Sequence, residues 1–237
     1  MIHEEYALFA GLDVSMNQTS VCLVDSSGDV IWRGACATDP ELLARTIRRA
    51  GAGRSTRVGL ETGSLSPWLV QGLREQGFET ICLDARHVRA ALSSRPNKSD
   101  ATDAEGIAQI LRSGWYREVH VKSLATHHLR ALLAARRLMV NKRTMLNNQM
   151  RGLLKVFGVK LGSGVAGSFA RRVMEVADAD EHLAQITRPL LTAWQTLGEQ
   201  IAIMDRMLRA TARDHPTCRL MMSVPGVGAL VAPSRRS

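Results

Sequence analysis

The sequence contains no uninterrupted apolar run of about 18 residues, the length that a membrane-spanning helix requires. Its first five residues lack the basic start of a secretory signal peptide. Only four cysteines are present, and none forms a CxxC pair. Three of them, Cys22, Cys36 and Cys82, fall in apolar segments of strand-like character, and the fourth is Cys218. We therefore expect buried free thiols and a location in the reducing cytoplasm.

Acidic residues are absent from residues 119–174, although this stretch carries eleven lysines and arginines. All 22 acidic residues lie elsewhere and outnumber the basic residues there, so the net charge of +9 comes from this one stretch. A solvated helix face usually mixes both signs, whereas an unneutralised basic run is typical of a surface that binds a polyanion. The residues that we expect to bind nucleic acid are Arg130, Arg136, Arg137, Lys142, Arg143, Arg151 and Lys155.

Strand-like and helix-like segments alternate over residues 6–116. We expect strands at residues 8–13, 20–24, 30–36, 57–61 and 80–83, the first three joined by short polar turns as in an antiparallel meander. Helices are expected at about residues 40–50, 67–76 and 85–92, and from residue 100 onwards. A three-stranded meander followed by βαβα units predicts an RNase H-like α/β fold, a mixed five-stranded sheet with helices on both faces.

Four carboxylates stand at the ends of these elements. Asp13 and Glu61 each end an apolar strand, and Asp100 and Asp103 lie three residues apart at the start of a helical pattern, so that they share a helix face. Acids brought together in this way repel one another unless a cation lies between them. Oxygen ligands suit Mg²⁺ or Mn²⁺, and such ions serve phosphodiester chemistry. For each acid alone, a helix cap or a turn residue is the commoner role.

Residues 125–213 show a helical pattern with apolar residues at heptad spacing. The first seam contains Leu132, Met139, Leu146 and Leu153, and the second contains Leu183, Leu190, Leu197 and Met204. Such coiled-coil seams are buried within an intrachain hairpin or between subunits, unless they are only a local core. We expect three regions, at residues 1–120, 121–214 and 215–237.

Residues 224–229, Val-Pro-Gly-Val-Gly-Ala, resemble the turn of a helix-hairpin-helix motif. In that motif the glycines allow backbone N–H groups to approach a DNA phosphate. The same turn is common in other proteins, and the nine residues after Gly228 do not form the second helix of the motif. We therefore expect an incomplete helix-hairpin-helix start.

Three segments resemble the signature of the insertion-sequence-110 family transposases: residues 11–15 (Gly-Leu-Asp-Val-Ser), 60–63 (Leu-Glu-Thr-Gly) and 98–108 (Lys-Ser-Asp-Ala-Thr-Asp-Ala-Glu-Gly-Ile-Ala). Residues 82–87, 119–122 and 148–154 are also similar to family sequence, so the resemblance extends over residues 7–231. It implies a RuvC-like catalytic domain in which Asp13, Glu61, Asp100 and Asp103 bind Mg²⁺ and act on DNA. It further implies DNA and a structured guide RNA as partners of the basic segment, and homo-oligomers formed through the long helices.

In this family a further domain follows the Pro-Gly turn and carries a serine that becomes linked to DNA. Residues 233–237 depart from the family pattern, so we expect a truncated copy that does not complete recombination by itself.

Two other functions remain open. A non-catalytic nucleic-acid-binding remnant would retain the basic stretch and idle carboxylates. An actin-like ATPase shares the Gly-Leu-Asp opening but needs a glycine in the turn that follows, and residues 16–18 contain none.

Overall fold

The structure is a computed structural model that describes residues 6–93, 100–162, 166–214, 218–220, 223–224 and 228, without the side chains of residues 100, 101 and 166. The chain divides into two compact units, Met1–Leu124 and Ala125–Ser237.

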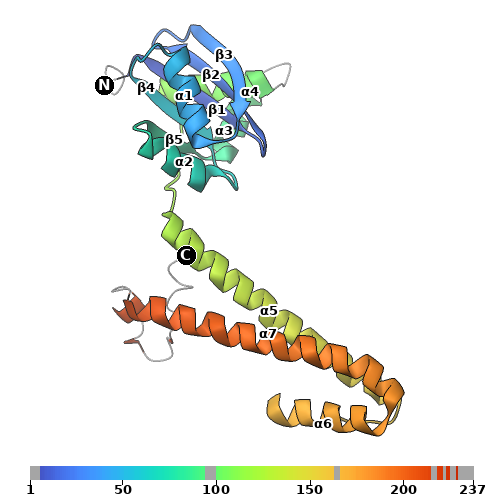
Figure 1. Ribbon diagram of the computed structural model, residues 1–237. Coiled ribbons are helices and arrows are strands. Elements are labelled where there is room, and N and C mark those ends of the chain that lie inside the picture. Colours follow the sequence, from blue (N-terminus) through green and yellow to red (C-terminus); the bar gives the residue numbers. More distant parts are fainter. Residues whose placement is uncertain are drawn as a thin grey trace. The chain divides into compact units, whose positions relative to one another are not determined.

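The first unit contains a five-stranded sheet with the strand order β3-β2-β1-β4-β5 (Figure 1). The first three strands are antiparallel neighbours, whereas β4 is parallel to β1 and β5 is parallel to β4. The strands are β1 (Leu8–Val14), β2 (Gln18–Asp25), β3 (Val30–Ala37), β4 (Thr56–Glu61) and β5 (Glu79–Leu83). This mixed sheet has the predicted RNase H-like order and confirms the predicted fold class.

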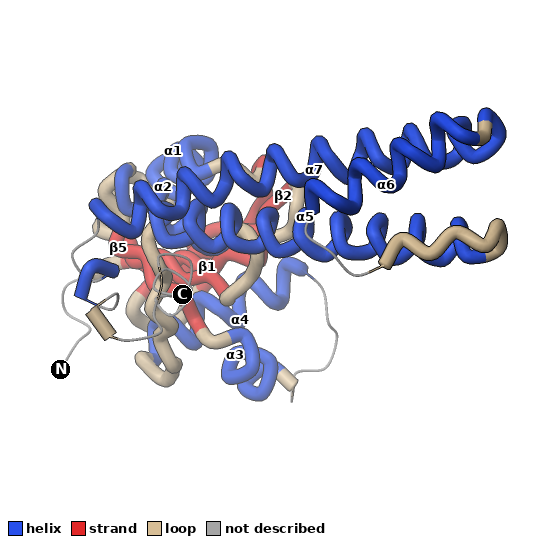
Figure 2. Tube along the Cα trace, turned by 90° about the horizontal axis from the view of Figure 1, so that it is seen from below, coloured by secondary structure: helices blue, strands red, loops and turns tan. Residues whose placement is uncertain are grey.

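Helices cover both faces of the sheet, and each face has its own apolar core. The helices of this unit are α1 (Pro40–Ala50), α2 (Ser66–Glu75), α3 (Ala85–Leu92) and α4 (Asp100–Ser113). Leu43 of α1 and Leu69 of α2 join one cluster, whereas Val88 of α3 and Ile107 of α4 join the other. Figure 2 shows the strands lying between these two pairs of helices.

Local sequence signals explain where these elements begin. The carboxylate of Asp39 accepts hydrogen bonds from the amides of Glu41 and Leu42, and Pro40 opens α1 with a fixed backbone angle. The central strand β1 is almost wholly apolar because it is covered on both faces. Cysteines 22, 82 and 218 are buried free thiols, as expected, while Cys36 is half-buried.

A close contact between α4 and β1 fixes the distance between the helix and the sheet. A Cβ atom built on Gly11 would lie 2.1 Å from the carbonyl oxygen of Ala104 and 2.4 Å from the amide nitrogen of Ala108. Both atoms belong to the helix backbone, so no side chain rotation would relieve the clash. Only glycine permits this approach at position 11.

The second unit consists of α5 (Leu124–Lys155), α6 (Ala166–Ala179) and α7 (Glu181–Asp214). One apolar cluster draws on all three helices, including Met150, Phe169 and Trp194. Every position of the two predicted seams is buried or half-buried in the structure. The predicted helical region is therefore confirmed, and Leu146, Leu183 and Leu190 of the seams belong to or pack against this cluster. Among the described helices, none has the length and apolar character needed to cross a membrane.

The predicted helix-hairpin-helix turn falls almost entirely outside the described residues. The predicted third region, residues 215–237, lies there as well, apart from six described positions.

We expect Gly11→Ala to destabilise the first unit by about 1–3 kcal/mol, because the added methyl forces α4 away from the sheet. Hydrogen exchange of β1 and α4 peptides would measure the loss locally. Gly152→Ala in α5 is the control, since nothing lies within 4 Å of its added Cβ. Unchanged protection in Gly11→Ala would contradict the close contact.

Candidate functional site

The register between β1 and β4 brings two of the predicted site residues together. Leu12 lies opposite Leu60, so Asp13 and Glu61, each one residue further on, reach the same level at the carboxyl ends of adjacent strands. Because side chains alternate along a strand, Asp13 and Glu61 share one face of the sheet. Both side chains are half-buried.

That face is the one that α4 covers. Gly11, two residues before Asp13, faces Ala104 of α4. Further along the helix, the Gln109 side chain donates a hydrogen bond of 2.7 Å to the carbonyl of Gly28, in the turn beside the amino end of β1. The helix therefore runs antiparallel to β1. Its first turn is directed toward the edge of the sheet where Asp13 lies.

Asp100 and Asp103 occupy this first turn. Position 100 is one helical turn before the buried Ala104, and Asp103 is one turn before the buried Ile107, so both positions continue the stripe that faces the sheet. Asp103 is half-buried, and the side chain of Asp100 lies outside the described residues. Among the side chains that are described, no three histidines, cysteines or acids form a metal-binding group.

Asp13 and Glu61 line a common cavity of about 200 Å³. Its other wall is the segment from Thr62 to Ser66, which leads from β4 into α2. No side chain caps the first turn of α2. Ser66, the first residue of α2, lines the cavity, so the positive end of the helix dipole lies beside it and favours negative charge on a carboxylate or on a ligand.

A carboxylate at the opposite edge of the sheet shows a different arrangement. Glu79 forms an ion pair with Arg57 and accepts a hydrogen bond from the hydroxyl of Tyr6. Burial raises the pKa of Glu79, but the hydrogen bonds from Tyr6 and Arg57 outweigh it and leave the pKa below its ordinary value. Glu79 is therefore a structural acid that is neutralised within the fold.

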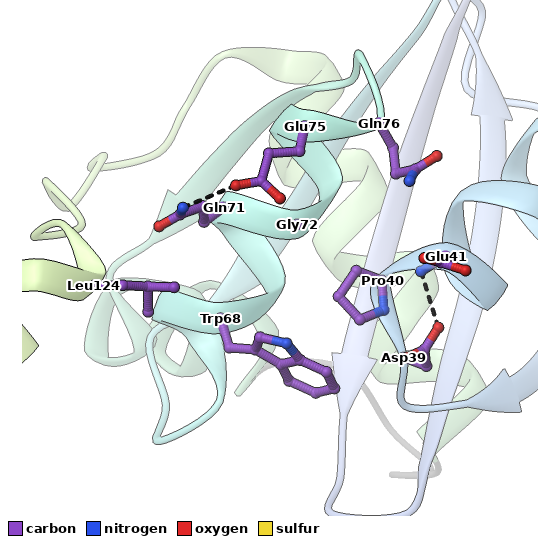
Figure 3. A pocket seen from close by; sticks show the side chains of 9 residues that line it. All are labelled: Asp39, Pro40, Glu41, Trp68, Gln71, Gly72, Glu75, Gln76 and Leu124. Carbon is purple, nitrogen blue, oxygen red and sulfur yellow. Dashed lines mark hydrogen bonds between the residues drawn. The ribbon is translucent and has the colours of Figure 1, made fainter. Parts of the chain in front are cut away.

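A second hollow, of about 230 Å³, lies between α1 and α2 and is partly lined by Trp68 (Figure 3). Two of its three acids have structural partners: Asp39 caps α1, and Glu75 accepts a hydrogen bond from Gln71. The cavity beside Asp13 is lined by acids at the ends of two adjacent strands, whereas the acids of this second hollow lie on or next to α1 and α2.

Three of the seven predicted nucleic-acid-binding residues make contacts inside the helical unit. Arg136 forms an ion pair with Asp205, and both side chains are at most a quarter exposed (25% and 17%). The guanidinium of Arg143 lies 3.9 Å from the ring centre of Trp194. Arg151 lies over the ring of Phe169 at 4.9 Å. These arginines hold α5 against α6 and α7, a role that their sequence pattern did not indicate.

The other four, Arg130, Arg137, Lys142 and Lys155, have exposed side chains. They are spread over most of the length of α5, which has no acid to neutralise them. These four residues are called the exposed basic set below.

Fold and site together define an RNase H-like protein in which Asp13 and Glu61 line one cavity at the carboxyl edge of the sheet. Residues 10–158 match the family model of the IS110-type DEDD transposases, which is described as "Transposase". The chain belongs to this family, as its sequence motifs predicted.

Curated relatives have similar names. The chain is 26% identical over 233 residues to the "Transposase for insertion sequence element IS1111A" of Coxiella burnetii, a match that covers 94% of this chain and 60% of the relative. It is 28% identical over 180 residues to the "Probable family 20 transposase" of Pseudomonas aeruginosa, covering 74% of this chain and 53% of the relative. The chain thus spans little more than half the length of these relatives.

Among solved structures, Thermus thermophilus RuvC aligns with a TM-score of 0.35 and 14% identity, over 47% of this chain and 99% of RuvC. At this score the assignment of the fold rests on the strand order alone.

Arg136 and Arg137 are adjacent but differ in their surroundings, so they form a matched pair. We expect Arg136→Gln to destabilise the helical unit by about 1–3 kcal/mol, because Asp205 would lose its partner in a half-buried position. Arg137→Gln should change stability by less than about 0.5 kcal/mol. Urea denaturation followed by helical circular dichroism would measure both, and equal losses would show that the ion pair contributes nothing.

Proposed function

We propose that this chain carries the metal-dependent DNA-strand chemistry of an insertion-sequence transposase. In this proposal Asp13, Glu61, Asp100 and Asp103 hold Mg²⁺, or Mn²⁺ in its place. The observation that carries it is the placement of Asp13 and Glu61 side by side over one cavity, at the edge toward which the acidic first turn of α4 is directed.

The donor set fits a hard divalent cation. Each of the four side chains offers only carboxylate oxygens, the ligands that Mg²⁺ prefers. Use of a divalent metal is also the general expectation for a DEDD transposase. When bound, the ion would supply Lewis-acid activation of a nucleophile and stabilise charge on the leaving oxygen of a phosphodiester. The protein's own part is to hold these carboxylates at a common level and to leave the cavity open to a nucleic-acid strand.

DNA binding is assigned to the exposed basic set on α5. Phosphate contacts supply most of the sequence-independent affinity for DNA, and they require side chains that reach solvent. A non-catalytic nucleic-acid-binding remnant would use the same four residues, so the two functions differ only in whether the carboxylates act. A guide RNA, homo-oligomers and a cytoplasmic location remain predictions from the sequence. Strand exchange by this chain alone is not part of the proposal, because the curated relatives extend well beyond the matched region.

We expect the chain to nick supercoiled DNA in the presence of Mg²⁺, and Asp13→Asn to lower the rate by roughly a hundredfold or more through loss of a metal ligand. Asp29→Asn is the matched control, because Asp29 is an exposed acid in the turn between β2 and β3. A chain that binds DNA but never nicks it would support the non-catalytic function. Equal activity of Asp13→Asn and wild type would contradict the proposed site.

Affinity for duplex DNA should fall about a thousandfold between roughly 50 and 200 mM salt if several phosphates are contacted. Replacing Arg137 and Lys142 by Gln should flatten the dependence of log affinity on log salt by up to about 1.8, or about 0.9 per lost contact. Fluorescence anisotropy would measure the affinity at each salt concentration. The double variant Arg45→Gln and Arg49→Gln removes the same charge from the exposed side of α1 and serves as the control. The same slope in both variants would place the contact surface elsewhere.

A further inference from the structure

A single buried hydroxyl closes the turn that follows Glu61. The Ser66 side chain donates a hydrogen bond of 2.8 Å to the backbone carbonyl of Glu61 and accepts one of 2.6 Å from the amide of Gly63. Ser66 is only 5% exposed. Strand β4 ends at Glu61 and α2 begins at Ser66, so this one side chain ties the helix start to the strand end.

The turn is also held from its other side. The amide of Thr62 donates a hydrogen bond of 2.9 Å to the carbonyl of Leu83, and its hydroxyl accepts one of 3.2 Å from the amide of Ala85. The backbone around Glu61 is therefore fixed between β5 and α3 on one flank and α2 on the other.

The hydroxyl of Ser66 does not serve its own helix. A serine at a helix start usually accepts a hydrogen bond from an amide of the first turn. Here the hydroxyl oxygen of Ser66 accepts its hydrogen bond from the amide of Gly63, which precedes the helix, and no side chain caps α2. The hydrogen bonds that Ser66 makes with Glu61 and Gly63 thus act on the strand end and the turn rather than on the first turn of α2.

Fixing this backbone matters because of the charge beside it. Two carboxylates on adjacent strands repel each other, and the repulsion favours any motion that separates them. A metal ion binds tightly only when its ligands are already held near their final positions by a supporting shell of hydrogen bonds.

We propose that Ser66 is a positioning residue for the metal site, because its hydroxyl keeps the Glu61 carboxylate level with Asp13. The inference rests on the proposed function, in which Glu61 is a metal ligand. It concerns binding of the ion itself, so it does not depend on catalysis by this chain.

Mn²⁺ binding to the full chain without DNA, measured by the loss of the free-ion signal in electron paramagnetic resonance, tests the proposal. We expect Ser66→Ala to weaken Mn²⁺ binding at least about tenfold, the usual effect of removing a supporting hydrogen bond. Thr56→Val is the matched control. Thr56 is 7% exposed, and its hydroxyl donates a hydrogen bond of 2.9 Å to the carbonyl of Arg54 at the opposite end of the same strand. This variant should keep the wild-type affinity.

The outcomes distinguish the positioning role of Ser66 from the proposed metal site itself. Wild-type affinity in Ser66→Ala, with binding lost in Asp13→Asn, would overturn the positioning role and leave the proposed site intact. Binding that is absent in the wild type, or unaffected by Asp13→Asn, would overturn both. Equal weakening in Ser66→Ala and Thr56→Val would indicate general loosening of the fold and would also overturn the positioning role.

A second variant covers the case in which Ser66→Ala does not fold. Ser66→Cys keeps a small side chain, slightly larger than that of serine, but replaces the hydroxyl with a poorer hydrogen-bond donor. We expect weaker Mn²⁺ binding here as well. Full affinity in the folded Ser66→Cys chain would overturn the proposal.

Discussion

The backbone contact between α4 and β1 at Gly11 is the constraint on which the candidate site depends. A glycine inside a strand weakens the strand, because it adds no side chain to the core and is costly to order. At this position it lets a helix backbone rest directly on the sheet. That contact sets the height of α4 above the sheet. It thereby also sets the height of the turn that carries Asp100 and Asp103. A larger residue would lift the whole acidic turn away from Asp13.

The acids at the two edges of the sheet lie in different surroundings. At the amino edge, Glu79 is neutralised by Arg57 and by the hydroxyl of Tyr6. At the carboxyl edge, Asp13 and Glu61 line an open cavity beside an uncapped helix start. The carboxyl edge thus places two carboxylates on a cavity, an arrangement suited to binding, whereas Glu79 serves the fold.

Features with a local or periodic signal could be predicted from the sequence, and features set by tertiary contact could not. The succession of strands and helices and the strand-end acids followed from apolar runs and polar turns, and the helical spacing placed Asp100 and Asp103 on one face. Which way that face points depends on Gly11, whose contact with α4 has no local signature. Ser66 was missed for a related reason: a serine at a helix start has the pattern of a cap, and only the structure shows its hydroxyl turned back toward Glu61.

The acid-free segment has a structural role as well as an electrostatic one. Arg136, Arg143 and Arg151 bind an aspartate, aromatic rings or backbone carbonyls, contacts for which the flat, multi-donor guanidinium is better suited than a lysine ammonium. An acid placed one turn away on α5 would compete with these partners, so the absence of acids also protects the packing of the helices. The net charge of the segment consequently overstates the charge that is available to a polyanion, because these three arginines are engaged within the helical unit.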